Sequence, residues 1–117
     1  MKTSLITVAA FSLALAFAQE QAQPQHIGGN VMQYNLASRV TPVYPPLAKQ
    51  QGIEGTVKFE ATIDKDGHVA DLKVLSGPPL LIQSAVDAVK QWVYKQTLLN
   101  GEPIAVLTTI DVNYTLQ

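Results

Sequence analysis

The sequence of 117 residues contains no cysteine. Disulfide bonds, the usual reinforcement of small exported domains, are therefore unavailable, and thiol redox chemistry and thiolate metal sites are excluded with them. Stability has to come from side-chain packing, and a domain of about 80 residues buries only a modest core. Support from a partner strand or from a second copy of the chain would be physically reasonable.

An excess of positive charge is also missing. Eight Lys and Arg residues stand against nine Asp and Glu residues, which gives a net charge of -1, and loss of Lys2 with an amino-terminal signal would make it -2. No stretch of the sequence is polybasic. Nucleic acid and anionic lipid surfaces are therefore not expected as partners.

Catalytic and cofactor-binding motifs are absent as well. The two histidines, His26 and His68, belong to no metal-spaced pair, nucleophile elbow or glycine-rich phosphate loop. Asp64, Asp66 and His68 could in principle surround a cation, but DKDG is foremost a turn signal and lacks the longer spacing of a calcium loop. We therefore predict no enzymatic activity, cofactor, metal or small-molecule substrate.

The amino terminus has the pattern of a secretory signal peptide. Lys2 precedes an apolar run from Leu5 to Ala18, which ends in small residues before the polar Gln19. This run of fourteen residues is shorter than the roughly twenty that span a bilayer. The sequence predicts that residues 1–18 are removed and that the chain works outside the cytoplasm, whereas an uncut signal would leave it anchored in a membrane.

Residues 19–38 are typical of a flexible leader. Gln19 to Asn30 is a glutamine-rich segment with one proline, two glycines and few apolar side chains, so burial cannot offset the entropy lost on ordering. Val31 to Arg39 is ambiguous between a short helix and a short strand, and Val31, Leu36 and Val40 could pack on the domain.

A strand hairpin is expected after the leader. Every second residue from Val57 to Ile63 is apolar, the DKDG turn follows, and His68 to Leu75 forms the return strand of an antiparallel pair. In the return strand Ala70, Leu72 and Val74 share one face.

An amphipathic helix and a long strand complete the pattern. Apolar residues recur at helical spacing from Leu80 to Val93, with Trp92 expected in the core, its ring nitrogen bonded to an acceptor. After a loop, LLNGEP, the residues from Ile104 to Leu116 alternate as a strand of up to thirteen residues. The order predicts an α+β fold, a two-layer β-β-α-β domain whose antiparallel three-stranded sheet has one helix packed on one face.

The last strand is unprotected against pairing with another chain. Soluble proteins blunt an edge strand with lysine, proline or a bulge. Between Ile104 and Leu116 there is no lysine, arginine, proline or glycine, and only Asp111 carries charge. Such a strand favours the addition of an extended peptide through main-chain hydrogen bonds. The leader could instead cover the edge, or two copies of the chain could pair through it as a homodimer.

Five landmarks give the chain a family resemblance. They are YPPLAKQQGIEGTVKF at Tyr44 to Phe59, the Asp66-Gly67 turn, the break at Ser76 and Gly77, QWVYK at Gln91 to Lys95, and the final alternating strand. Together they resemble the TonB C-terminal domain family over residues 39–117.

This resemblance implies recognition of a short extended peptide, the TonB box of outer-membrane receptors, by pairing beside the last strand. The peptide-binding residues that it implies are Thr41, Pro42, Tyr44, Pro45, Val106, Thr108, Thr109, Ile110, Asp111, Val112 and Tyr114. Tyr44 with Pro45 could instead pack on the sheet as a structural latch. The chain departs from well-studied members at Thr41, where they carry glutamine, and at Val93, where they carry arginine.

A full energy transducer of this family needs an uncleaved membrane anchor and a long proline-rich spacer across the periplasm. The leader spans only about 70 Å when fully extended. We therefore predict a free periplasmic binding module that recognises a TonB-box-like segment of an outer-membrane receptor or another envelope protein. The alternatives are a short transducer held in the inner membrane by an uncut signal, and a structural envelope protein that dimerises through the same edge.

Overall fold

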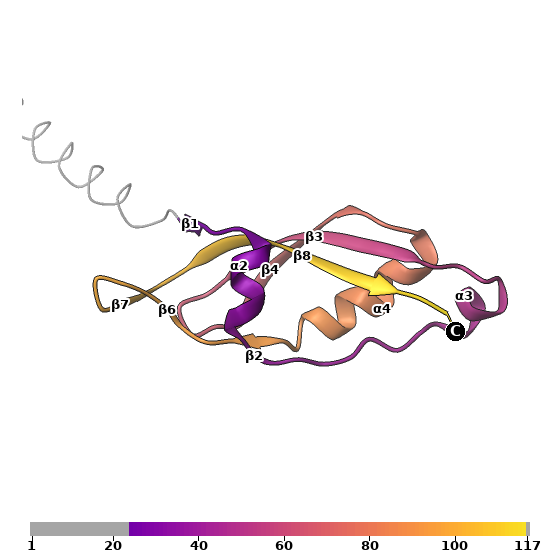
Figure 1. The fold of residues 1–117 in the computed structure, drawn as a ribbon, viewed down its shortest axis with the longest axis horizontal. Coiled ribbons are helices and arrows are strands. Elements are labelled where there is room, and N and C mark those ends of the chain that lie inside the picture. Colours follow the sequence, from indigo (N-terminus) through magenta and orange to yellow (C-terminus); the bar gives the residue numbers. More distant parts are fainter. Residues whose placement is uncertain (1–23, 117) are drawn as a thin grey trace, which may run out of the picture.

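The computed structural model describes residues 24–116 (Figure 1). The predicted signal peptide, residues 1–18, and the first part of the leader lie outside the described residues. The elements are β1 (Gln25–His26), α2 (Gly29–Met32), a 3₁₀ turn (Gln33–Asn35), β2 (Leu36–Ser38), α3 (Pro46–Gln50), β3 (Gly55–Ile63), β4 (Val69–Ser76), α4 (Pro79–Val89), β5 (Val93–Tyr94), β6 (Thr97–Leu99), β7 (Glu102–Ile104) and β8 (Val106–Tyr114). None of the helices in this part of the chain is long and apolar enough to cross a membrane.

The main sheet has the strand order β1-β8-β3-β4. Three antiparallel strands, β8, β3 and β4, form the sheet predicted from the alternating patterns, with β3 in the middle. The two-residue β1 adds a fourth, parallel strand beyond β8 that the sequence did not predict. The structure confirms the α+β fold class and adds this short strand to the sheet.

The helix α4 packs across one face of this sheet (Figure 1). It begins at Pro79, whose fixed φ and missing N–H suit the first helical turn. In β8 every second side chain is buried, and those between are more exposed. The buried side chains of the helix, the sheet and the segments packed on them form one core. Its members are Met32, Ala48, Val57, Phe59, Ala61, Ile63, Leu81, Ala85, Val89, Trp92, Tyr94, Val106, Ile110, Val112 and Tyr114.

The chain leaves the helix earlier than predicted. α4 ends at Val89, and Val93–Tyr94 form β5, which pairs with β2. The Tyr94 N–H donates to the Gly67 carbonyl at 2.8 Å, so the hairpin turn also holds this segment extended. The apolar spacing continues as far as Val93 and therefore predicted a helix to that point. The backbone of Val93 and Tyr94 instead bonds to distant residues, and these bonds hold the segment as a strand.

The final strand is shorter than the predicted thirteen residues. β8 has nine residues, and the segment before it folds into a separate hairpin of β6 and β7. Asn100 and Gly101 connect these strands with φ values of 54° and 82°, and positive φ at both positions is typical of a type I′ turn. An Asn-Gly pair is a strong hairpin signal, so the interpretation of this segment as a loop was wrong.

β4 does not keep the predicted alternation. The register with β3 shifts so that Ala70 is skipped, and Val69 and Leu72 both pack against the core. Ala70 is exposed, and Val74 is 39% exposed at the border of the sheet. Leu72 and Val74 are opposite Ala61 and Phe59 and keep the shared face that the sequence predicted, whereas Ala70 leaves it because a bulge adds one residue to the strand.

Residues 24–38 pack against the domain, where the sequence predicted a flexible leader. Met32 in α2 is 1% exposed and belongs to the core, and Ile27 and Leu36 are partly buried against it. A segment with few apolar residues can dock when some of them reach the core, as Met32 does here, because burial of a single large side chain contributes about 1.5–3 kcal/mol.

We predict that Gly67→Ala destabilises the domain severely. The φ of Gly67 is +94°, and a Cβ there would lie 1.9 Å from the backbone carbonyl oxygen of Tyr94. The turn could accept alanine only by moving away from β5. We expect a loss of unfolding free energy of about 3 kcal/mol or more, measured by urea denaturation.

Gly52→Ala and Gly101→Ala are matched controls. Their φ values are +67° and +82°, but a Cβ at either position has nothing within 4 Å. These variants should lose only the cost of a left-handed alanine, about 1–2 kcal/mol. Equal losses in all three variants would show that the contact between Gly67 and Tyr94 does not matter for stability.

Candidate functional site

The main sheet has two long strands at or near its edges, β4 and β8, that could pair with another strand. They differ in how well they are protected against such pairing. β4 carries two register shifts and the charged residues Asp71 and Lys73, which are devices that discourage edge pairing. β8 pairs with all nine residues of β3 without a shift and contains one charged residue, Asp111. The side beside β8 is therefore the better template for an added strand.

Alternate residues of β8 turn their backbone groups away from β3. The Ala105 and Leu107 carbonyls accept hydrogen bonds from the β1 side at 3.0 Å, so the odd-numbered residues face outward. By the same alternation Thr109, Asp111 and Asn113 turn their N–H and C=O groups outward, and within residues 24–116 these groups have no backbone partner. We call Ala105 and Leu107 the covered half of this outer edge, and Thr109, Asp111 and Asn113 its open half. Within the open half, Gly29 lies against the Thr109 carbonyl oxygen, so in the described part of the chain Asp111 and Asn113 are the residues with nothing beside them on this edge.

β1 corrects the expectation that the last strand lies at the border along its whole length. It pairs with Val106 and Leu107, and the chain then crosses β8 close to Thr109 before α2 begins. The alternative in which the leader covers the edge therefore applies to the covered half. The open half keeps the arrangement that the sequence predicted.

The predicted peptide-binding residues of β8 fall into two groups. Thr109 and Asp111 are exposed and belong to the open half. The remaining five have buried side chains, and their backbone groups pair with β3: Val106, Thr108, Ile110, Val112 and Tyr114. These five residues hold the strand in the core, so only the first group can pair directly with an added strand.

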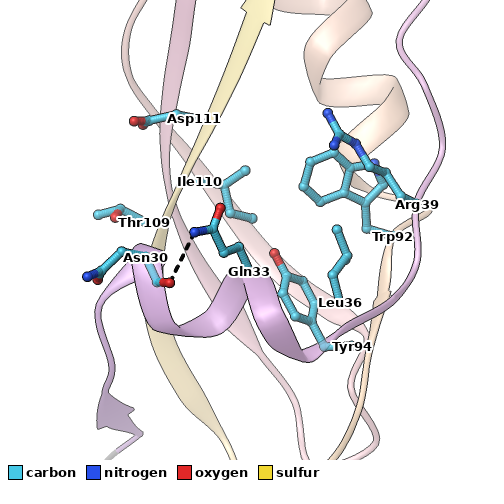
Figure 2. A pocket seen from close by; sticks show the side chains of 10 residues that line it. Asn30, Gln33, Leu36, Arg39, Trp92, Tyr94, Thr109, Ile110 and Asp111 are labelled. Carbon is cyan, nitrogen blue, oxygen red and sulfur yellow. Dashed lines mark hydrogen bonds between the residues drawn. The ribbon is translucent and has the colours of Figure 1, made fainter.

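A trough of about 290 Å³ runs beside the open half (Figure 2). Its walls come from α2, β2, β5 and β8 together with their flanking residues: Gly29, Asn30, Gln33, Leu36, Arg39, Trp92, Tyr94, Thr109, Ile110 and Asp111. Figure 2 shows the Ile110 side chain on the side of Trp92, whereas Thr109 and Asp111 point the other way. An added strand would therefore turn alternate side chains toward two chemically different surfaces.

Trp92 forms the back wall of this trough. Its side chain is 4% exposed, and its Nε1–H donates to the Val40 carbonyl at 2.8 Å, which confirms the predicted core position. The Arg39 guanidinium carbon lies 5.3 Å from the ring centroid, within the range of a cation–π interaction. Burial raises the pKa of Tyr94 to about 12 although Arg39 lowers it, so the Tyr94 hydroxyl stays protonated at neutral pH.

The sequence did not indicate Asn30, Gln33 or Arg39 as residues of the site. Gln33 Nε2 donates to the Asn30 backbone carbonyl at 3.2 Å, so the α2 turn itself orients the Gln33 side chain. Both lie in the predicted leader, and they reach the site only because α2 packs on β8. No short motif marks such residues, since their role depends on contacts with a distant part of the chain.

Tyr44 packs between the domain's elements as a latch. Its hydroxyl donates to the Ile53 carbonyl, and its ring meets the Tyr114 ring edge-on with 5.4 Å between centroids. Burial raises the pKa of Tyr44, and the charge of Glu54 raises it further, so the hydroxyl remains a donor. These contacts support the structural interpretation of Tyr44 over direct contact with a peptide.

Thr41, Pro42 and Pro45 line a second groove, of about 380 Å³, between their own segment and α4. None of these three residues lines the trough beside β8. The structure therefore does not bring the two predicted groups of peptide-binding residues into one cavity.

Ser84 of α4 is partly buried and makes two contacts through its hydroxyl. Its hydroxyl donates to the Val43 carbonyl and lies 2.9 Å from the Tyr114 hydroxyl. It thus joins α4 to the proline-containing segment and to the carboxyl end of β8. The downstream end of the open half is fixed to the core by these contacts.

The DKDG turn brings together the ligand atoms of Asp64, Asp66 and His68, all within 4.8 Å of one another. Asp64 Oδ1 accepts the N–H groups of Asp66 and His68 at 2.9 Å each, and such bonds stabilise an Asx-type turn. The arrangement of these side chains is accounted for by the turn.

Comparison with known sequences points to one family. Residues 40–116 match the family model of the Gram-negative bacterial TonB protein C-terminal. Protein TonB of Vibrio cholerae is 37% identical over 84 residues, which cover 70% of this chain and 34% of that protein. Protein TonB of Xanthomonas campestris is 31% identical over 78 residues, 65% of this chain and 35% of that protein. The chain spans about a third of the length of these curated relatives.

Two solved structures resemble the fold. The solution structure of the Pseudomonas aeruginosa TonB C-terminal domain matches with a TM-score of 0.60 at 27% identity, over 70% of this chain and 85% of that one. The TonB2 protein of Vibrio anguillarum matches with a TM-score of 0.52 at 28% identity, over 83% of each chain. Sequence and fold comparisons therefore agree.

We predict that Tyr44→Phe lowers the unfolding free energy by about 1 kcal/mol, because the Ile53 carbonyl loses its donor. Tyr34→Phe removes a hydroxyl from a side chain that is 78% exposed and should leave stability unchanged. Urea denaturation of the two variants measures the contrast. Unchanged stability of Tyr44→Phe together with weaker peptide binding would instead show that Tyr44 contacts the peptide.

Proposed function

The chain belongs to the TonB C-terminal domain family, and on this basis we propose that it docks an extended segment of an outer-membrane receptor along β8. The segment would add as a further strand on the open half of the outer edge. Main-chain hydrogen bonds would hold it, and alternate side chains would set its register. The family suggests a TonB-box-like segment as the partner.

The observation that carries this proposal is the unshifted, nearly uncharged β8 with three outward-facing residues unpaired. Because Gly29 lies against the Thr109 carbonyl oxygen, the fully open residues are Asp111 and Asn113, which offer up to about four main-chain hydrogen bonds. At about 1 kcal/mol each, these bonds would give only weak binding once the cost of association is subtracted. Side chains of the added strand must therefore contribute, and the trough supplies the surface for them.

The trough supports a segment with two different faces. Side chains that point into the trough would meet a mixed surface, because Leu36 lies there beside the polar Asn30, Gln33 and Arg39, so partner side chains with both apolar and polar atoms are expected at those positions. Side chains on the opposite face would lie near Asp111, where polar or basic residues are favoured. This alternation is the specificity that we propose for the site.

We also propose that the module acts in the periplasm as a binding protein and not as an enzyme. Transmission of force from an inner-membrane motor would additionally require an anchor, which an uncut amino-terminal signal would provide. The two proposals differ in the state of residues 1–18, and cell fractionation separates them.

We predict that osmotic shock releases the protein and that its first residue is Gln19. A signal of the observed length is expected to be cut and not to stay in the bilayer. Amino-terminal sequencing of the released fraction checks this. Retention in membranes after salt and alkali washing, with Met1 or Lys2 at the amino terminus, would support the anchored transducer.

We predict that Asp111→Pro weakens binding of a synthetic TonB-box peptide at least about tenfold, which corresponds to about 1.4 kcal/mol. Proline removes one outward N–H from the open half, and the domain should stay folded because proline is tolerated where the N–H faces away from the sheet. Isothermal titration calorimetry measures the affinity, and circular dichroism checks the fold.

Val74→Pro is the matched control on the opposite side of the sheet. Its partner Phe59 bonds to β8, so the Val74 N–H also faces away from β3. This variant should bind the peptide normally. Normal binding by a folded Asp111→Pro would contradict docking along β8. If Asp111→Pro abolished a dimer seen by analytical ultracentrifugation and left peptide binding intact, self-pairing through this edge would be the better assignment.

A further inference from the structure

The first described residues already occupy the outer edge of β8. The Gln25 N–H donates to the Ala105 carbonyl and the Ile27 N–H donates to the Leu107 carbonyl, both at 3.0 Å. The parallel register also turns the Leu107 N–H toward Gln25. The edge of β8 thus holds an extended segment of its own chain through main-chain hydrogen bonds.

This pairing is weakly supported by side chains. β1 has two residues, Gln25 and His26, and both are exposed. It depends on a few main-chain bonds, each with a modest net contribution. Met32, by contrast, fixes α2 in the core with 1% exposure. β1 can therefore leave the edge while α2 remains docked.

Gly29 marks the point where the leader crosses β8. A Cβ on Gly29 would lie 2.3 Å from the Thr109 carbonyl oxygen and 2.8 Å from the Thr109 hydroxyl. Only a residue without a side chain permits so close an approach of two backbones. Beyond this crossing the chain continues as α2, and the open half of the edge begins.

Building on the docking function proposed above, we infer that residues 24–29 are a built-in occupant of the covered half, which a receptor segment spanning all of β8 must displace. The covered and open halves belong to one strand with an uninterrupted register. A partner pairing along its whole length would replace the bonds of β1 with equivalent bonds of its own. The leader thus competes with the partner and limits how much of β8 is available.

The size of this competition follows from the bonds involved. Displacing two or three main-chain hydrogen bonds is expected to reduce the apparent affinity of a full-length partner about tenfold. Releasing the leader in advance should recover that factor. A short partner that pairs only with the open half should be unaffected.

We expect Gly29→Ala to release residues 24–28 from the edge, because the added Cβ would meet the Thr109 carbonyl oxygen and push the two backbones apart. In the unmodified protein the Leu107 amide should exchange with solvent deuterium at least about tenfold more slowly than the Asp111 amide, because β1 covers it. Gly29→Ala should remove most of this difference. Gly28→Ala is the matched control, because a Cβ on Gly28 meets only the flexible side chain of Asn30, at 2.8 Å, and Leu107 should stay protected.

A reversible disulfide that holds β1 on β8 tests the opposite change, in which β1 cannot leave the edge. His26 and Leu107 are register partners in β1 and β8, and neighbouring strands lie at a spacing that a disulfide can bridge. Because the chain has no other cysteine, His26→Cys with Leu107→Cys forms a single bridge on oxidation. A synthetic TonB-box peptide long enough to span the nine residues of β8 should bind the oxidised form about tenfold more weakly than the reduced form. The same peptide should bind Gly29→Ala about tenfold more tightly than Gly28→Ala.

Equal affinities of the oxidised and reduced forms, or a Leu107 amide as fast as that of Asp111 in the unmodified protein, would overturn the inference and leave docking on the open half intact. A peptide that binds no form would contradict the docking function itself, and amide exchange would still decide whether the leader occupies the edge. If Gly29→Ala fails to fold, deletion of residues 1–27 removes β1, keeps Met32, and provides the same contrast with the unmodified protein.

Discussion

The nine-residue pairing of β8 with β3 is the constraint on which the rest of the structure depends. Because this ladder has no register shift, every second side chain of β8 enters the core and every second backbone unit faces away from β3. In this strand, the residues whose side chains enter the core are those whose backbone groups bond to β3, and the residues between them have more exposed side chains and outward backbone groups. The strand therefore anchors itself through Val106 to Tyr114 at even positions, and it presents Leu107 to Asn113 at odd positions.

The two ends of β8 are held by different contacts, which bears on the docking that we propose. At its carboxyl end Tyr114 meets the Tyr44 ring and the Ser84 hydroxyl, so the open half runs between two fixed points, this end and the crossing at Gly29. An edge that is already straight and held by core contacts loses little freedom when a strand is added. The contacts of Tyr44 would thus affect the proposed docking through the position of β8.

Elements with a clear period could be predicted from the sequence, and elements that depend on distant contacts could not. The alternation of β3 and the spacing of α4 are local, and both gave the right element. The helical prediction ran on to Val93 because apolar spacing says nothing of the bond from Tyr94 to Gly67. Likewise Asn30 and Gln33 belong to the site only through the packing of α2 on β8, and Arg39 belongs to it because its guanidinium lies over Trp92.

Protection of the sheet edge against unwanted pairing also gives a reason why a leader with few apolar residues packs on β8. A bare, regular edge of nine residues invites unwanted pairing, and β4 avoids it with shifts and charges that would equally prevent docking. β8 cannot use those devices and still accept a partner. Covering half of the edge with a weakly held segment, hinged at Gly29 and secured by Met32, shortens the exposed template without altering the strand itself.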